Sequence, residues 1–184
     1  MKFKKLIICV TICLCTNCGV KEDTEFSQMG LSFTIPKGWY IIEDDNTSSE
    51  SYLIGIGDKH RISDGVFYAI WFTFEKDINE LLELAKESYE NNMLKPIFKI
   101  KYSESKSIEF KGNDAVKVDI TIDGIQIKFI GEIICFNWNG YSIMLVFIEN
   151  TKKHNKIKPD FEKIMNSLKR ISNGIKKKKG SYIV

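Results

Sequence analysis

Residues 115–148 read AVKVDITIDGIQIKFIGEIICFNWNGYSIMLVFI, and this stretch decides the fold. Hydrophobic residues occupy every second position of 116–122, which predicts a strand with one buried face. The dipeptides Asp123-Gly124 and Asn139-Gly140 are typical of type I′ hairpin turns, so we expect antiparallel strands at 115–122, 125–136 and 141–148. The last of these is almost wholly apolar, which predicts a central strand covered on both faces.

Five further strands and two helices are expected around this core. The strands are predicted from alternating or β-branched runs at 30–35, 39–42, 52–56, 66–74 and 106–110. The first helix should begin after the capping residue Asp77 and end before Pro96. The second should open at Pro159-Asp160 and carry an apolar stripe from Phe161 to Ile171. The predicted class is therefore α+β, an antiparallel sheet sandwiched by helices.

Composition indicates a folded domain with no affinity for nucleic acid. The chain has 184 residues, of which 43% are hydrophobic and 12% aromatic, and this excludes a disordered protein. Its formal net charge is +3, and it falls to zero without the three lysines at positions 2, 4 and 5. A polyanion-binding protein needs a sustained basic surface, which this balance does not provide.

The N-terminus has the features of an export signal. Three lysines precede an apolar run, Leu6–Cys15, which is too short for a spanning helix of roughly 20 residues. Residues 14–18, LCTNC, resemble a bacterial lipobox, and this predicts that Cys18 is lipidated with an acyl chain such as palmitate. Asn17 stands where a small residue is usual, and Cys15 where leucine is commonest. The alternative is ordinary cleavage and release, which would leave Cys18 as a free thiol.

These features predict four segments. Residues 1–17 are a lipoprotein signal peptide, 18–29 a tether, 30–171 the folded domain and 172–184 a basic C-terminal tail. The tail lysines, Lys176–Lys179, are interpreted as a solubilising end, with binding to anionic lipid as the alternative. The tether sequence Lys21-Glu22-Asp23 resembles a surface-export signal of outer-membrane lipoproteins, but a solvated linker would have the same composition. We expect a protein anchored at the outer membrane, on either its surface or its periplasmic face.

Three short segments resemble the PsbP-like domain family, which includes DcrB-type bacterial lipoproteins. They are GLSFTIPKGW at 30–39, FKGNDA at 110–115 and the helical segment 161–168. The resemblance implies a PsbP-like α/β/α sandwich on an exported protein, often tethered by lipid. It also implies an accessory or assembly role rather than catalysis, because the family shares no catalytic residues.

Few residues are candidates for chemistry. His60 and His154 lie beside lysines in polar segments and are expected at solvated loop tips, so neither a metal nor a cofactor is predicted. Cys135 lies in an apolar run and should be a buried hydrophobic residue. The acidic run Glu43-Asp44-Asp45 could help bind a hard cation, but a solvated turn is the favoured interpretation. Asp119 should pair with a lysine on an exposed face.

Five aromatic residues are candidates for the lining of a ligand groove. Most are expected in the core, with Trp138 as the most exposed ring; the set is Trp39, Tyr40, Trp71, Phe72 and Trp138.

The sequence thus predicts a lipid-anchored, non-enzymatic binding or assembly module of the bacterial envelope. Its partners would be the membrane, through the lipid, and an envelope protein. One alternative is a released periplasmic carrier of a small ligand. The other is a hydrolase that uses the loop carboxylates Asp44, Asp58 and Asp64.

Overall fold

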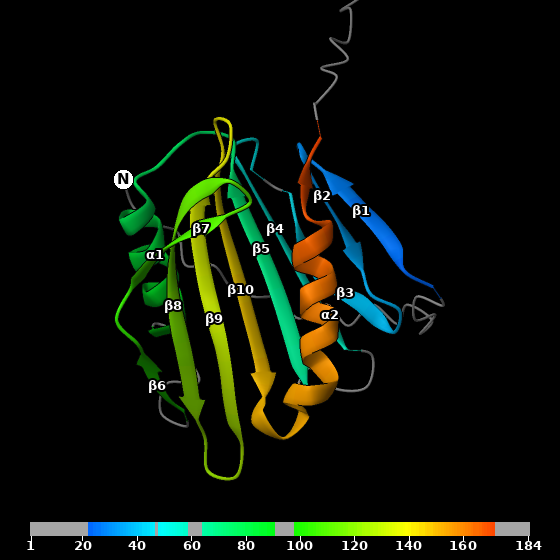
Figure 1. Ribbon diagram of the computed structural model, residues 1–184, viewed down its shortest axis with the longest axis vertical. Helices are drawn as coiled ribbons and strands as arrows, with labels where there is room; N and C mark the ends of the chain where they lie inside the picture. The colour runs from blue at the N-terminus through cyan, green and yellow to red at the C-terminus, as the bar shows by residue number, and fades with distance from the viewer. Residues whose placement is uncertain (1–21, 47, 59–63, 91–97, 172–184) are drawn as a thin grey trace, which may run out of the picture.

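The computed structural model describes residues 22–46, 48–58, 64–90 and 98–171 (Figure 1). In chain order the elements are β1 (Thr24–Gln28), β2 (Leu31–Ile35), β3 (Trp39–Asp45), β4 (Ser51–Asp58), β5 (Gly65–Phe72), α1 (Ile78–Glu90), β6 (Lys99–Tyr102), β7 (Lys106–Phe110), β8 (Asn113–Asp123), β9 (Lys128–Asn137), β10 (Ser142–Asn150), a 3-10 turn (Thr151–Lys153), α2 (His154–Ser167) and β11 (Lys169–Arg170). His60, the signal segment with Cys18 and the tail 172–184 lie outside the described residues.

A large antiparallel sheet organises the domain. Its strand order is β3-β4-β5-β10-β9-β8-β6, with β7 also paired to β8. The apolar strand β10 lies between β5 and β9, and every residue from Ser142 to Ile148 is buried. The prediction of a central, doubly covered strand is therefore confirmed.

The two faces of the large sheet carry separate hydrophobic cores. On one face, α1 packs Leu81, Leu82 and Ala85 against strands β8 to β10. On the other, α2 contacts β10 and also β2 of a small sheet, ordered β1-β2-β11, so that helix and small sheet form one layer (Figure 1). The predicted α+β class, an antiparallel sheet with helices on both faces, is confirmed.

Of the two predicted type I′ turns, the structure confirms one and corrects the other. Asn139 and Gly140 have φ of 52° and 83°, as a type I′ turn requires. The Asp123-Gly124 prediction is wrong in type: Asp123 pairs with Lys128, and Gly124 N–H donates to Ile127 O at 2.8 Å, which leaves a four-residue loop. Strand β9 therefore begins at Lys128 rather than at residue 125, and Asp123 Oδ1 lies 3.6 Å from Lys128 Nζ.

The N-terminal boundary of the domain also requires correction. Residues 24–28, predicted as tether, form β1, which pairs with β2 through a turn at Met29-Gly30. Phe26 is only 8% exposed and packs against Phe33, with ring centroids 5.0 Å apart. One apolar residue among five gives almost no periodicity, so only the docking of Phe26 identifies this strand.

Helix α2 begins earlier than predicted. It starts at His154, and Pro159 lies inside it rather than at its opening. Proline removes the helical donor to the carbonyl of Asn155, but Asn155 is exposed and water can satisfy that oxygen. Burial of Ile157, Phe161 and Ile164 stabilises the helix across the proline. The chain then forms β11 instead of continuing the helix to Ile171.

Helix α1 begins where its cap predicts. Asp77 Oδ1 accepts hydrogen bonds from the backbone N–H groups of Asn79 and Glu80, at 2.9 and 3.1 Å.

The acidic residues Glu43–Asp45, predicted as a loop, belong instead to β3, because the backbone pairing with β4 continues past a register shift.

Replacing Phe26 with alanine tests whether β1 belongs to the folded core. We expect a loss of about 3–5 kcal/mol in unfolding free energy, because the change opens a cavity among aromatic rings. Denaturant unfolding measures it. Ile125→Ala is the matched control, since Ile125 is 89% exposed and its loss should cost less than about 0.5 kcal/mol. Equal losses of unfolding free energy from the two changes would show that residues 24–28 belong to the tether and not to the folded core.

Candidate binding pocket beside helix α2

A polar stripe follows β8 on the side of the large sheet where α2 lies. Val118 and Ile120 point into the core beneath α1, so the alternating residues Lys117, Asp119 and Thr121 point to the opposite face. Helix α2 packs over β10 rather than over this stripe, which therefore stays accessible.

Beside the stripe lies a pocket of about 260 Å³. It is bounded by strands β8 to β10 on one side and by α2 on the other. Its lining residues are Lys117, Asp119, Ile120, Thr121, Ile130, Gly131, Glu132, Phe147, Glu149, His154 and Phe161. We call this the α2 pocket.

Glu149 is the buried charged residue of the α2 pocket. It continues the apolar face of β10 after Leu145 and Phe147, and its side chain is only 8% exposed. Its Oε1 lies 2.5 Å from Nδ1 of His154, the first residue of α2. Its Oε2 is buried and has no hydrogen-bond partner within the described part of the chain.

Lys117 pairs with the other two acids of the pocket, Glu132 and Asp119. Its Nζ contacts Glu132 Oε2 closely and lies 3.7 Å from Asp119 Oδ1. Partial burial lowers the pKa of Lys117, but the hydrogen bond and charge of Glu132, together with Asp119, outweigh it, so the pKa is raised. Lys117 therefore stays protonated and remains paired with these two carboxylates. The predicted pairing of Asp119 with a lysine is confirmed, with Lys106 as a second partner at 3.6 Å.

Gly131 permits the close approach of strands β9 and β10 at the pocket. A Cβ atom at this position would stand 1.9 Å from the carbonyl oxygen of Phe147, which no side chain can tolerate without a backbone shift. The position therefore requires glycine because of close packing.

Of the predicted site residues, the structure brings Asp58 and Asp64 near one lysine, Lys156: the hydrogen bond of Asp58, with the charges of both carboxylates, raises the pKa of that lysine. His154, expected at a solvated loop tip, instead starts α2 and pairs with buried Glu149, because the helix begins six residues before Asp160. Asp58 pairs with Lys156 at 2.8 Å, and Asp64 lies 4.0 Å from Lys153. Asp44 accepts a hydrogen bond from Tyr52. In the β3–β4 pairing, Asp44 lies opposite Ile54, which is four residues before Asp58 in β4.

Cys135 and the aromatic residues lie mainly in the core. Burial raises the pKa of the Cys135 thiol to about 12, although Lys86 opposes this, so the prediction of a buried hydrophobic residue is confirmed. Trp39 and Trp71 are also buried. Trp138, expected to be the most exposed ring, is half-buried, as are Tyr40 and Phe72; it packs against the core, and its carbonyl accepts a hydrogen bond from Arg170 of β11.

Metal ligation has little support in the described ranges. No group of three or more His, Cys, Asp or Glu side chains there has a geometry that could hold a metal ion. The α2 pocket offers instead one unpaired carboxylate oxygen, a histidine in contact with the same carboxylate, and two aromatic rings, Phe147 and Phe161. That combination suits recognition of a ligand carrying hydrogen-bond donors.

Sequence reasoning missed Glu149 as a candidate. The available signal was its place at the end of the run 143–148, where an acid continues the buried alternation of Ile143, Leu145 and Phe147. A charged residue at a position predicted to be buried is an indication of function.

Comparison with solved structures identifies the fold. The cyanobacterial PsbP protein of Synechocystis superposes with a TM-score of 0.58 at 12% identity, over 87% of this chain and 99% of that one. The fold is PsbP-like.

Two further structures share this fold. LpqN of Mycobacterium tuberculosis, a protein involved in cell envelope biogenesis, gives 0.52 at 10% identity over 81% of this chain and 90% of its own. A Bacteroides thetaiotaomicron protein gives 0.52 at 12% identity, over 84% of this chain but only 50% of its own. No family model matches the sequence, and neither does any curated protein.

Replacing Gly131 with alanine should destabilise the domain by about 3 kcal/mol, the upper end of ordinary overpacking, because the obstructing atom belongs to the backbone. Thermal and denaturant unfolding both measure the change. Gly57→Ala is the matched control in β4: its Cβ would lie 3.5 Å or more from every neighbour, and we expect less than about 1 kcal/mol. Similar losses at both sites would show that the approach of β9 to β10 is not tight.

Proposed function

We propose that this protein is a lipid-anchored, non-enzymatic accessory module of the bacterial cell envelope that binds or assembles with a partner. The lipobox-like sequence before Cys18 and the PsbP-like fold support this proposal. LpqN, which shares the fold, is involved in cell envelope biogenesis. The anchor would hold the domain at the outer membrane, on its periplasmic or its surface face.

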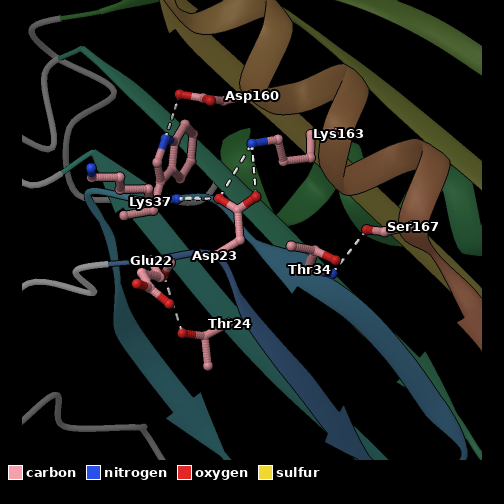
Figure 2. A network of polar contacts seen from close by, with 9 residues as sticks. Glu22, Asp23, Thr24, Thr34, Lys37, Asp160, Lys163 and Ser167 are labelled. Carbon is pink, nitrogen blue, oxygen red and sulfur yellow. Dashed lines mark hydrogen bonds and ion pairs between the residues drawn. The ribbon is translucent and has the colours of Figure 1, made fainter.

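The observation that carries the proposal is the short length of chain between Cys18 and the first residue fixed to the domain. Asp23 accepts hydrogen bonds from the backbone N–H of Lys37 at 2.9 Å and from Nζ of Lys163 in α2 at 2.9 and 3.2 Å (Figure 2). These bonds, led by that of Lys163, hold the pKa of Asp23 below its usual value. The carboxylate therefore stays ionised at neutral pH and ties the N-terminal segment to α2.

This tie sets the distance between the domain and a lipid on Cys18. Four residues separate Cys18 from Asp23, so the chain between them can span at most about 18 Å. Such an anchor would keep the α2 layer and the small sheet next to the bilayer surface. A short tether suits a module that meets its partner at the membrane.

Binding accounts for the polar side chains better than catalysis does. Of the carboxylates in the hydrolase alternative, Asp58 and Asp64 both lie near Lys156 and are paired with Lys156 and Lys153, whereas Asp44 accepts a hydrogen bond from Tyr52. The one described thiol, Cys135, has a raised pKa and is buried, which argues against a nucleophilic role.

Within the described residues, no helix has the length and apolar character needed to cross a membrane.

Changing Cys18 to serine tests the anchor. In a bacterial host fed labelled palmitate, the native chain should carry label and fractionate with membranes, because two or more acyl chains hold a protein stably on a bilayer. Cys18→Ser should carry none. Cys15→Leu is the matched control: it removes a neighbouring cysteine, restores the commonest lipobox residue and should keep the label.

Two outcomes would contradict the proposal. An unlabelled native chain that is soluble after signal removal would favour the released carrier. Label that persists in Cys18→Ser would assign the lipid to another residue. Membrane retention of unlabelled Cys18→Ser through its uncleaved signal is recognised by its larger mass.

A further inference from the structure

The α2 pocket contains a carboxylate whose hydrogen bonding is incomplete. Glu149 is more than nine-tenths buried, and its Oε1 is in contact with His154. The other oxygen, Oε2, is buried with no partner in residues 22–46, 48–58, 64–90 and 98–171. An ionised carboxylate oxygen removed from water without a donor is strongly unfavourable, so Oε2 requires a donor from outside the described structure.

The described residues around Glu149 do not supply that donor. Across the sheet, Glu149 pairs with Gly65 of β5, which has no side chain, and with Ile130 of β9, which is apolar. Lys117, the lysine lining the pocket, is held by Glu132 and Asp119. Gly65 is further closed off, because Ile157 of α2 would stand 2.8 Å from a Cβ at that position.

Charge and size narrow the class of ligand. Among the lining side chains, the three carboxylates of Asp119, Glu132 and Glu149 outnumber the basic groups of Lys117 and His154, so the pocket has an excess of negative charge. Its volume of about 260 Å³ is below the range of drug-sized sites, which begins at about 300 Å³. A few heavy atoms carrying a positive charge would fill it, with Phe147 and Phe161 against an alkyl stem.

The geometry distinguishes between the two cations that proteins commonly present. A guanidinium binds best with two parallel bonds to both oxygens of a carboxylate, but Oε1 of Glu149 is already occupied by His154. A primary ammonium needs only one oxygen and can direct its other donors elsewhere in the pocket.

We propose that the α2 pocket binds an alkyl primary ammonium group, with Glu149 as its counter-ion. This inference rests on the proposed binding role and assigns it a ligand chemistry. The group can be the side chain of a lysine in a partner polypeptide or a free alkylamine.

The test uses the histidine signals of the full chain in detergent micelles. The chain has two histidines, so His60→Gln leaves His154 as the only one. Titration of this protein with n-butylamine, followed by NMR of the His154 ring, should give a saturable shift. n-Butanol, a neutral molecule of similar shape, should give none, and ammonium chloride controls for ionic strength. A pentapeptide with a central lysine is the second probe.

Glu149→Gln should weaken amine binding at least tenfold, since the amide keeps the shape and removes the charge. Glu109→Gln is the matched control: Glu109 is exposed on β7, outside the α2 pocket, and its change should leave the titration unaltered. Thermal unfolding confirms that both variants are folded. Binding of the peptide as well as butylamine assigns the pocket to a lysine of a partner, and binding of butylamine alone assigns it to a free amine; both support the inference.

Three results would overturn the inference: no saturable shift with either amine, an equal shift with n-butanol, or undiminished binding by folded Glu149→Gln. If Glu149→Gln does not fold, the titrations of the protein that retains Glu149 with n-butylamine and with n-butanol still test whether the pocket binds an ammonium group. None of these results bears on palmitate labelling at Cys18, so failure of the ligand assignment is distinguishable from failure of the proposed anchor.

Discussion

The burial of β10 is the constraint on which the rest of this structure depends. All residues from 142 to 148 are buried, so both faces of the strand need an apolar cover. Helix α1 provides it on one face, and α2 with the small sheet provides it on the other. Each methylene group buried there contributes about 0.8 kcal/mol, so burial of this strand is a main source of stability for the three layers.

The candidate site arises where that constraint ends. At Glu149 the inward-facing alternation of β10 continues with a carboxylate, while the cover provided by α2 is just beginning at His154. The charged residue is therefore buried at the margin of the core, beside an accessible polar stripe on β8. A pocket at such a margin combines low solvent exposure, which strengthens electrostatic interactions, with an open route for a ligand.

The ends of the domain show why local patterns fail where packing decides. Thr24–Gln28 has one apolar side chain, yet it forms a strand because Phe26 enters an aromatic cluster with Phe33 and Trp71. His154–Lys158 has a polar sequence followed by proline, yet it is helical because Ile157 is buried against the large sheet. In both cases one buried side chain outweighs an unfavourable local propensity.

The sequence by itself determined the strands of residues 115–148, the Asn139-Gly140 turn, the Asp77 cap and the α+β class, because alternation, positive φ and capping are properties of neighbouring residues. The segments resembling PsbP-like domains agreed with the fold of the solved structures. Only the tertiary structure decided that Lys117, Glu132, Glu149 and His154, from three strands and a helix, line one pocket. Their proximity depends on how α2 crosses the large sheet, and that placement follows from the fit of distant apolar surfaces, which no local pattern encodes.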